Sequence, residues 1–205
     1  IKWSEQEMFN TALNFSKMDT EMARQAYQLG NDARDWKVKY AQQDLQESGL
    51  NKANVKPILY RPFDIRYTYY TGNSRGFHCM PRNDVMRHFL EDNKAINVVR
   101  QVKTGETWQH CLVSNTISES CFLSNKTSEI GYVFPLNLYK EKTTKKSHVQ
   151  SIMIFEPEAD YGDKGRVPNI DKAVYETLQK SYRKKITPEE ILYYIYAVLY
   201  SNIYR

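Results

Sequence analysis

Residues 57–70 read PILYRPFDIRYTYY, so that two arginines lie among five aromatic rings within fourteen residues. The β-branched and aromatic residues from Ile65 to Tyr70 favour a β-strand, and residues 71–76, TGNSRG, supply the chemistry of a turn. Planar guanidinium groups and rigid aromatic faces also suit the holding of phosphates and base edges. Two interpretations stay open: a contact surface for a polyanion, or a tyrosine-rich strand whose arginines are merely solvated.

The rest of the chain predicts an α+β fold with one mixed central β-sheet of about five strands, between residues 56 and 155. Helices are expected before this sheet, over the first fifty residues, and after it, over residues 170–203. The strand candidates are rich in β-branched and aromatic residues and are separated by turn signals. They lie at 65–70, 96–102, 108–113, 117–123 and 129–139, with a last apolar patch at 152–155.

Several helix boundaries follow from capping residues. Asp19 or Thr20 is expected to cap a helix that runs through Leu29. Asp32 is expected to cap a second helix from Arg34 to about Glu47. Asn83 or Asp84 is expected to cap a short helix that ends near Leu90. Near the end of the chain, Thr187-Pro188-Glu189-Glu190 has the pattern of a capping box with proline in the first turn. Residues 191–200 are apolar nearly all round, so this last helix is expected to be buried on several sides.

Composition and charge suggest a partner and a compartment. Hydrophobic residues make up 41% and charged residues 26% of the 205 residues, as in ordinary globular proteins, and the net charge is +5. Residues 56–103 hold nine Lys and Arg against four Asp and Glu, and a second basic run lies at 140–146. Such local excess is typical of a polyanion partner. Three cysteines without close pairing, with no membrane span and no signal peptide, predict a cytoplasmic location, and the start at Ile1 suggests a piece of a longer chain.

No catalytic, metal or cofactor site is predicted in this segment. The sequence has no Gly-x-Gly, no Pro-Pro and no Walker lysine motif, which S-adenosylmethionine binding, an adenine pocket and ATP hydrolysis would require. The triplets at 35–37 and 92–94 fit the acid-x-Lys pattern of nucleases, but so short a pattern arises by chance. His78-Cys79, His110-Cys111 and Cys121 could be zinc ligands, but adjacent residues are poor ligand pairs. Buried cysteines and hydrogen-bonded histidines are the favoured interpretation.

Residues 60–70 resemble the Tyr-Arg-Pro-Phe-Asp-x-Arg-x-x-Tyr-Tyr signature of single-polypeptide restriction–modification enzymes, the type ISP and related type IIG group. In those enzymes the signature lies after the adenine methyltransferase domain, at the start of the target-recognition region. Further segments resemble motifs of the same family in the same order. They are residues 29–38, 81–88, 99–101, 108–110, 118–121, 124–132, 134–139 and 188–201.

The resemblance implies that residues 1–55 are a helical connector from the methyltransferase domain and that residues 56–205 form the target-recognition domain. The implied function is to bind double-stranded DNA at a specific sequence and to position a target adenine for the methyltransferase and nuclease domains. The implied parent is a site-specific DNA adenine methyltransferase and endonuclease that uses S-adenosylmethionine, Mg²⁺ and possibly ATP. Its methyltransferase and motor domains would be partners of this segment within one polypeptide.

Candidate DNA-binding residues follow from that implied function. Arginines can bind phosphates or the edge of guanine, lysines add sequence-independent attraction, and amides can bind base edges. The candidates are Arg61, Arg66, Arg75, Arg82, Arg87, Arg100, Gln101, Lys103, Asn125 and Lys126, with the run at 140–146. An internal ion pair between Asp64 and Arg66 is the competing interpretation for part of this set.

Two other classes of function stay open. The apolar C-terminal helix and the N-terminal helices could make the chain a protein-interaction module that docks on another domain without touching DNA. A free-standing nuclease is disfavoured because the sequence lacks a catalytic constellation.

Overall fold

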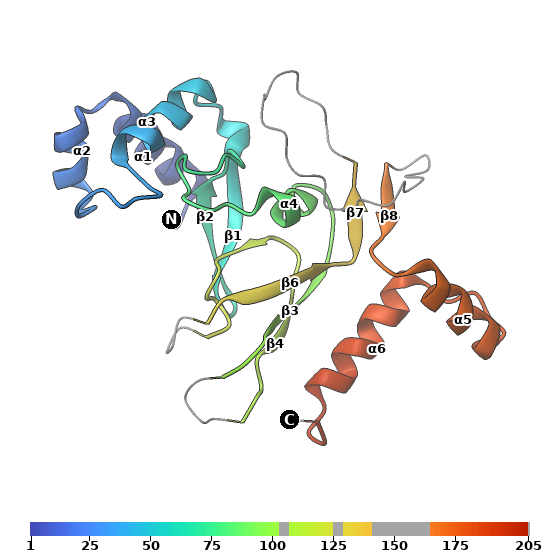
Figure 1. Cartoon of the computed structure of the whole chain (residues 1–205). Coiled ribbons are helices and arrows are strands. Elements are labelled where there is room, and N and C mark those ends of the chain that lie inside the picture. Colours follow the sequence, from blue (N-terminus) through green and yellow to red (C-terminus); the bar gives the residue numbers. More distant parts are fainter. Residues whose placement is uncertain (103–106, 125–128, 141–164, 205) are drawn as a thin grey trace.

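The structure of the chain, a computed structural model, describes residues 1–102, 107–124, 129–140 and 165–204 (Figure 1). The helices are α1 Glu5–Lys17, α2 Thr20–Ala26, α3 Val38–Glu47, η1 Lys52–Asn54, α4 Asn83–Met86, η2 Arg87–Phe89, α5 Lys172–Tyr182 and α6 Pro188–Tyr200. The strands are β1 Val55–Arg61, β2 Asp64–Tyr69, β3 Ala95–Val99, β4 Cys111–Ser114, β5 Ile117–Ser118, β6 Gly131–Pro135, β7 Asn137–Tyr139 and β8 Arg166–Pro168. None of these helices is long and apolar enough to cross a membrane.

The predicted α+β class is confirmed, but the described strands form three small sheets rather than one sheet of about five strands. Their orders are β2-β1-β5, β4-β3-β6 and β7-β8. The strand predicted over 117–123 ends at Ser118 because the chain turns there, with Phe122 N–H donating to Glu119 O. The strand predicted over 129–139 breaks at Leu136, whose N–H donates to Lys94 O, so that β6 and β7 belong to different sheets.

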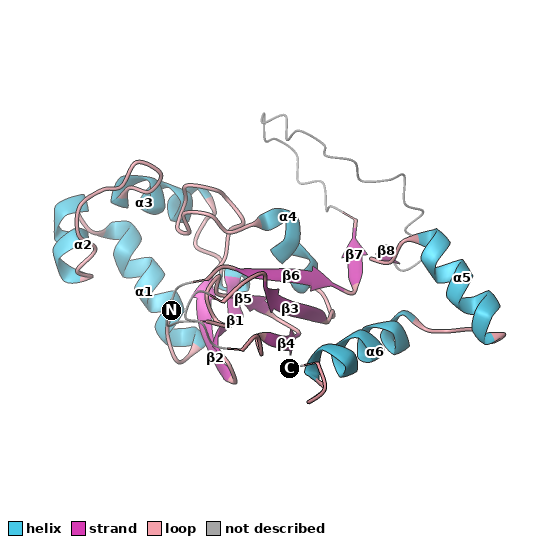
Figure 2. Cartoon of the chain, turned by 60° about the horizontal axis from the view of Figure 1, so that its bottom comes forward, coloured by secondary structure: helices cyan, strands magenta, loops and turns pink. Residues whose placement is uncertain are grey.

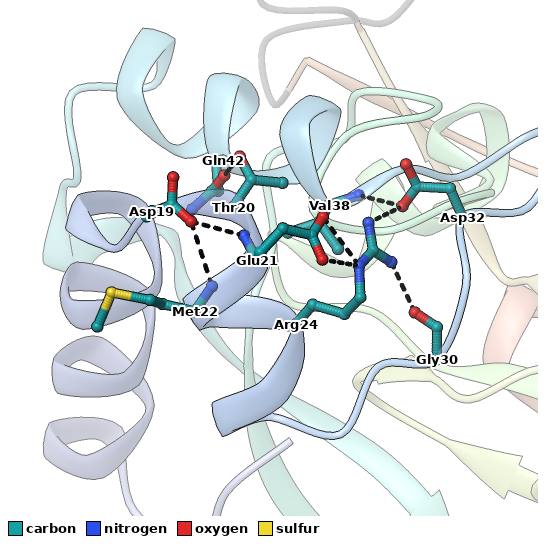
Figure 3. Close-up of polar contacts among 9 residues, drawn as sticks. All are labelled: Asp19, Thr20, Glu21, Met22, Arg24, Gly30, Asp32, Val38 and Gln42. Carbon is teal, nitrogen blue, oxygen red and sulfur yellow. Dashed lines mark hydrogen bonds and ion pairs between the residues drawn. The ribbon is translucent and has the colours of Figure 1, made fainter.

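Capping explains where the N-terminal helices begin. Asp19 caps α2 as predicted, and its carboxylate accepts hydrogen bonds from the backbone of Glu21 and Met22 (Figure 3). The second predicted helix was expected from Arg34, but α3 begins at Val38 because Ala33 and Trp36 exchange backbone hydrogen bonds in a tight turn. Asp32 nevertheless accepts a hydrogen bond of 3.2 Å from Val38 N–H.

Arg24 holds the link between α2 and α3 (Figure 3). Its guanidinium donates to Gly30 O at 2.6 Å and pairs with Asp32 at 2.8 Å and with Glu21 at 3.1 Å. The hydrogen bond from Arg24 holds the pKa of the Asp32 carboxyl below its usual range. One arginine therefore fixes the short connection that sets α3 beside α1.

The N-terminal helices and the β1–β2 hairpin share one hydrophobic core. Met8 and Phe15 of α1 pack with Val38 and Leu45 of α3, and Tyr69 of β2 is fully buried among them. The division at residues 55 and 56 stays a prediction, but the N-terminal helices pack on the hairpin that follows them. Figure 2 shows these helices on one side of the strands, with α5 and α6 on the other side.

A second and a third apolar cluster continue toward the C-terminus. Ile58, Phe89 and Ala95 join β1 to β3, and Leu192 of α6 packs with Ile96 of β3 and its neighbours. The layers thus follow the order of the chain, with the sheets that contain β1 and β3 between the N-terminal helices and helices α5 and α6 (Figure 2).

The last helix forms as predicted but is not buried as predicted. Thr187 Oγ1 accepts from Glu190 N–H and Glu190 accepts from Thr187 N–H, which is a complete capping box. Leu192 is the residue of α6 that is fully buried, at 5% exposure, because the helix meets β3 and β4 on one side. The expectation that α6 would be buried on several sides was therefore wrong.

Candidate nucleic-acid interface

The opening sequence motif forms the β1–β2 hairpin and its turn. Leu59 pairs with Ile65 and Arg61 with Asp64, with a bulge between Leu59 and Arg61. The turn residues are Pro62 and Phe63, and Phe63 has a positive φ of 64°. This turn lies at the lower end of the hairpin in Figure 1, beside the start of β6.

Arg61 is tied into the scaffold. Its Nη1 lies 2.8 Å from the carboxylate of Glu119 and donates to Tyr60 O at 2.6 Å, while its guanidinium lies 4.1 Å from the centre of the Tyr60 ring. Glu119 follows β5, so the ion pair connects β1 to a segment 58 residues later. The geometry makes Arg61 a brace of the turn.

Arg66 is held on three sides. Its guanidinium makes a two-pronged hydrogen bond to Asp64 and lies 4.0 Å from the Trp3 ring centre and 4.3 Å from the Tyr60 ring centre. The internal pair of Asp64 and Arg66, weighed above against a DNA contact, is the arrangement that the structure has. A planar guanidinium between two rings suits such stacking better than lysine would.

Arg75 and Arg82 lie at the other end of the hairpin, in the segment after β2. Both side chains are exposed; Arg75 lies 3.5 Å from Asp35, and Arg82 lies 3.0 Å from Asp84. The pairing with Arg82 holds the pKa of the Asp84 carboxyl below its usual range. These two pairs are solvated, so they are weak and can exchange partners.

The loop that carries Arg75 is fixed by a buried carboxylate. Asp44 of α3 accepts hydrogen bonds from Thr71 Oγ1 at 2.8 Å, Asn73 Nδ2 at 2.7 Å and Phe77 N–H at 2.7 Å. Sequence reasoning missed Asp44 and Glu119 as partners, because neither stands near its partner in the sequence.

Arg87 contributes to packing rather than to an open surface. It donates to Tyr139 O at 3.0 Å and so connects η2 to β7.

Arg100 and Gln101 differ from the other described candidates. Both are exposed, and neither has a hydrogen bond or an ion pair with any residue that the structure describes. They follow Val99, which pairs with Gly131, and Gly131 N–H donates to Ser120 O beside Glu119. Through these contacts the end of β3 lies at the same end of the molecule as the β1–β2 turn.

The structure thus brings only some of the predicted DNA-binding residues close to one another. Arg61, Arg66, Arg100 and Gln101 lie toward the turn end, whereas Arg75 and Arg82 lie in the segment that follows the other end of β2. Lys103, Asn125, Lys126 and residues 141–146 fall outside the described residues. We call the surface formed by residues 61–64 with Arg100 and Gln101 the turn-end surface.

A small cavity lies between the hairpin and the segment that follows it. It measures about 210 Å³, with Ile58, Met86 and Phe122 among its lining residues and His78 and Tyr70 as polar groups. That volume is below the roughly 300–1,000 Å³ typical of ligand pockets. Among the residues described, no group of three His, Cys, Asp or Glu is placed to hold a metal ion.

The fold is of the α+β class, and a comparison with protein families makes the assignment specific. The model of the type ISP C-terminal specificity domain matches residues 1–205. The chain belongs to this family, and the resemblance stated above is confirmed.

Comparison with solved structures agrees with that assignment at the level of the fold. The chain is similar to part of the protein chain in the cryoEM structure of a DrdV–DNA complex, with a TM-score of 0.53 and 18% sequence identity. The match covers 97% of this chain and 18% of that chain. No curated protein matches the sequence.

Proposed function

We propose that the chain is the DNA sequence-recognition domain of a restriction–modification enzyme. It binds duplex DNA and positions a target adenine for the methyltransferase and nuclease domains of its parent polypeptide. Membership of the specificity-domain family supports the role. Arg100 and Gln101 direct the proposal to particular residues, because both are exposed at the same end as the β1–β2 turn and have no partner among the described residues.

The chemistry of these two side chains suits base recognition. An arginine fork can donate two hydrogen bonds to O6 and N7 of guanine, and a glutamine amide can bind N6 and N7 of adenine. Both groups are available without breaking a contact to any described residue. Arg61 and Arg66 would have to break ion pairs first, so we assign them to bracing the turn. The exposed Arg75 and Arg82 keep a role in phosphate contacts at most.

Duplex binding by single-residue variants tests this assignment. Arg100→Ala and Gln101→Ala are compared with Arg34→Ala, which removes the same charge as Arg100→Ala, but from an exposed side chain beside Asp35. Each turn-end variant should weaken binding to the recognised sequence by a factor of about 5 to 150, the equivalent of 1–3 kcal/mol. Arg34→Ala should change binding only through net charge.

The salt dependence of the same variants separates phosphate contacts from base contacts. If Arg100 binds a phosphate, its removal should lower the slope of log affinity against log salt by about one. If it reads a base, the slope should stay and the sequence preference should relax. Equal loss in Arg100→Ala and Arg34→Ala would place the interface elsewhere and defeat the assignment.

The chemistry of the parent polypeptide is part of the proposal. The chain spans 18% of the length of the DrdV chain that it matches, so most of a comparable enzyme would lie outside it. We propose that the parent is an adenine-specific DNA methyltransferase and endonuclease of the cytoplasm, with S-adenosylmethionine, Mg²⁺ and possibly ATP bound by its other domains. Transfer of a labelled methyl group to adenine in a bound duplex, by the polypeptide that carries this domain, is the test.

A second candidate function is docking on a neighbouring protein domain, and one observation favours it. Helix α6 exposes Tyr193, Tyr194, Ile195 and Val198, of which Tyr193 accepts a hydrogen bond from Lys94 Nζ, directly before β3. Single apolar residues scattered over a surface need no explanation, but several apolar side chains exposed together on one helix suggest a binding site. Tyr194→Ser with Val198→Ser should weaken association with the methyltransferase domain and leave duplex affinity unchanged. Loss of duplex binding in that variant would count against a separate docking face.

A further inference from the structure

We propose that Phe63 is a wedge residue that enters a base step of the bound duplex from the β1–β2 turn. This inference rests on the proposed function and names the residue that opens the DNA. It concerns a side chain outside the set of arginines, lysines and amides that sequence reasoning selected.

Phe63 has almost no contact with the rest of the chain. Its side chain is 92% exposed, more than that of any other aromatic residue that the structure describes. An aromatic ring in water is unfavourable and is common at binding surfaces, where a partner covers it. Packing within the chain therefore gives no reason for a phenylalanine at this position.

The backbone gives no reason for it either. Phe63 has a φ of 64°, in the left-handed region, where a residue with a Cβ is strained and glycine is favoured. Proline followed by a residue of positive φ is the pattern of a type II turn, which usually has glycine or asparagine at the second of these positions. The chain uses glycine at other positive-φ sites, such as Gly30 and Gly72. A strained residue whose side chain is almost fully exposed suggests a role in binding.

Phe63 also differs from most other non-glycine residues with positive φ. Gln28, Leu50 and Arg183 lie within three residues after a helix end, where their N–H groups donate to carbonyl groups of the last turn. Phe63 lies between two strands and ends no helix.

The base of the turn is rigid. On one side Arg61 is paired with Glu119 at 2.8 Å, and on the other Asp64 makes a two-pronged contact with Arg66, which is stacked on Trp3. Pro62 restricts the backbone before the ring. The backbone of the turn is thus held in place, so little backbone entropy is lost when the ring inserts.

The charges around the ring favour nucleic acid as the partner. The two arginines and two carboxylates that brace the turn form two ion pairs, so the tip itself is electrically balanced and apolar. At the same end of the molecule, Arg100 supplies an exposed cation and Gln101 an exposed amide. An apolar tip beside an exposed arginine suits a duplex, where the arginine contacts the backbone or a base edge and the ring unstacks a step.

Such a wedge matches the task of an adenine methyltransferase partner. Enzymes that modify a base rotate it out of the stack and must supply the energy of unstacking. A ring that stacks on the exposed neighbouring base returns part of that energy and does so for any base. Phe63 would therefore act without contributing to sequence preference, which Arg100 and Gln101 would supply.

The test exploits the strain at Phe63. Phe63→Gly removes the ring and relieves the backbone, so the melting temperature should rise or stay unchanged while duplex affinity falls by about tenfold. Phe63→Trp keeps a stacking ring and should keep duplex affinity. Tyr182→Ala, which removes an exposed ring from the end of α5, is the matched control and should change neither quantity.

A fluorescent base reports the opening directly. Duplexes selected from a random pool for binding to the wild-type chain carry 2-aminopurine at successive positions, and its emission rises when a neighbouring base unstacks. Wild type and Phe63→Trp should raise the emission at one step, and Phe63→Gly should not.

The outcomes separate this inference from the proposed function. If the wild-type chain binds duplex DNA and Phe63→Gly binds it equally well with the same emission, the wedge is disproved and the proposed function stands. If the wild-type chain binds no duplex at low salt, the proposed function fails and the wedge fails with it. A Phe63→Gly chain that loses stability instead would show that the ring has a structural role, which also overturns the inference.

Discussion

The carboxylate of Asp44 accepts a hydrogen bond of 2.7 Å from the backbone N–H of Phe77, across 33 residues of sequence. The same carboxylate binds Thr71 and Asn73, so one side chain of α3 organises the whole loop after β2. Asp44→Asn keeps the shape but replaces one acceptor oxygen with a donor. We expect it to lower the free energy of unfolding by about 2–3 kcal/mol, because a donor of the loop is left unpaired. Urea unfolding measures the loss.

Gly76 offers an independent test of the same contact. A Cβ at this position would overlap the Asp44 carboxylate, which three hydrogen bonds hold in place. Gly76→Ala should therefore destabilise the chain, and the double variant Asp44→Ala with Gly76→Ala should lose less than the sum of the single losses. A coupling of about 1 kcal/mol or more is expected, and additive effects would contradict this packing.

Arg66 should not tolerate replacement by lysine. Lysine keeps the charge but loses both the fork that binds Asp64 and the flat face that lies on Trp3 and Tyr60. We expect Arg66→Lys to lower the free energy of unfolding by about 1–2 kcal/mol and to change the emission of Trp3. Arg34→Lys, at a side chain 91% exposed, is the control and should have no measurable effect.

Local signals in the sequence predicted local structure well. Asp19 caps α2, and Thr187 with Glu190 forms the capping box of α6, because these contacts join residues two or three positions apart. The β-branched and aromatic run from Ile65 predicted β2 for the same reason, since strand preference is carried by consecutive residues.

Long-range partners could not be predicted in this way. Whether Arg61 faces solvent or a carboxylate depends on Glu119, and the sequence does not say that these two residues meet. Arg100 has the same side chain and no described partner. The candidate residues could therefore be chosen by type, but their sorting into braces and open contacts needed the fold.

The sequence also could not predict which strands would belong to the same sheet. Residues 129–139 have continuous strand character, yet the Leu136 N–H donates to Lys94 O and the chain passes from the sheet of β3 to that of β8. Strand preference of single residues carries no information about which neighbour a strand will pair with.

His78 should make stability depend on pH in a narrow window. Burial is the largest cause that lowers its pKa, and it outweighs the backbone hydrogen bond with Tyr69 and the charge of Asp44, which raise it. Because its pKa is lower in the folded chain, the unfolded chain binds protons more readily there. The stabilisation is fully present above the unfolded value of about 6.5 and is lost as the pH falls below it.

The variant His78→Gln isolates this effect. Glutamine can keep the hydrogen bond that His78 Nε2 makes with Thr68 Oγ1, at 2.9 Å, but does not titrate. Between pH values of about 5 and 6.5, where carboxylates stay ionised, the melting temperature of the wild type should fall more steeply than that of His78→Gln. Parallel curves would show that this histidine does not contribute.

The capping box of α6 should decide whether the last helix stays folded. Thr187→Ala removes the side chain that accepts from Glu190 N–H and should cost about 1 kcal/mol. Because Leu192 is the helix residue that is fully buried, tertiary packing offers little compensation, and amide exchange should accelerate in α6 before it does in β3. The hydrogen bond from Thr187 N–H also lowers the pKa of Glu190, so its stabilisation is present above the usual glutamate value and is lost as the pH falls through the lowered one. Thr177→Ala, in the exposed middle of α5, is the control; equal exchange rates in α6 for both variants would refute the role of the cap.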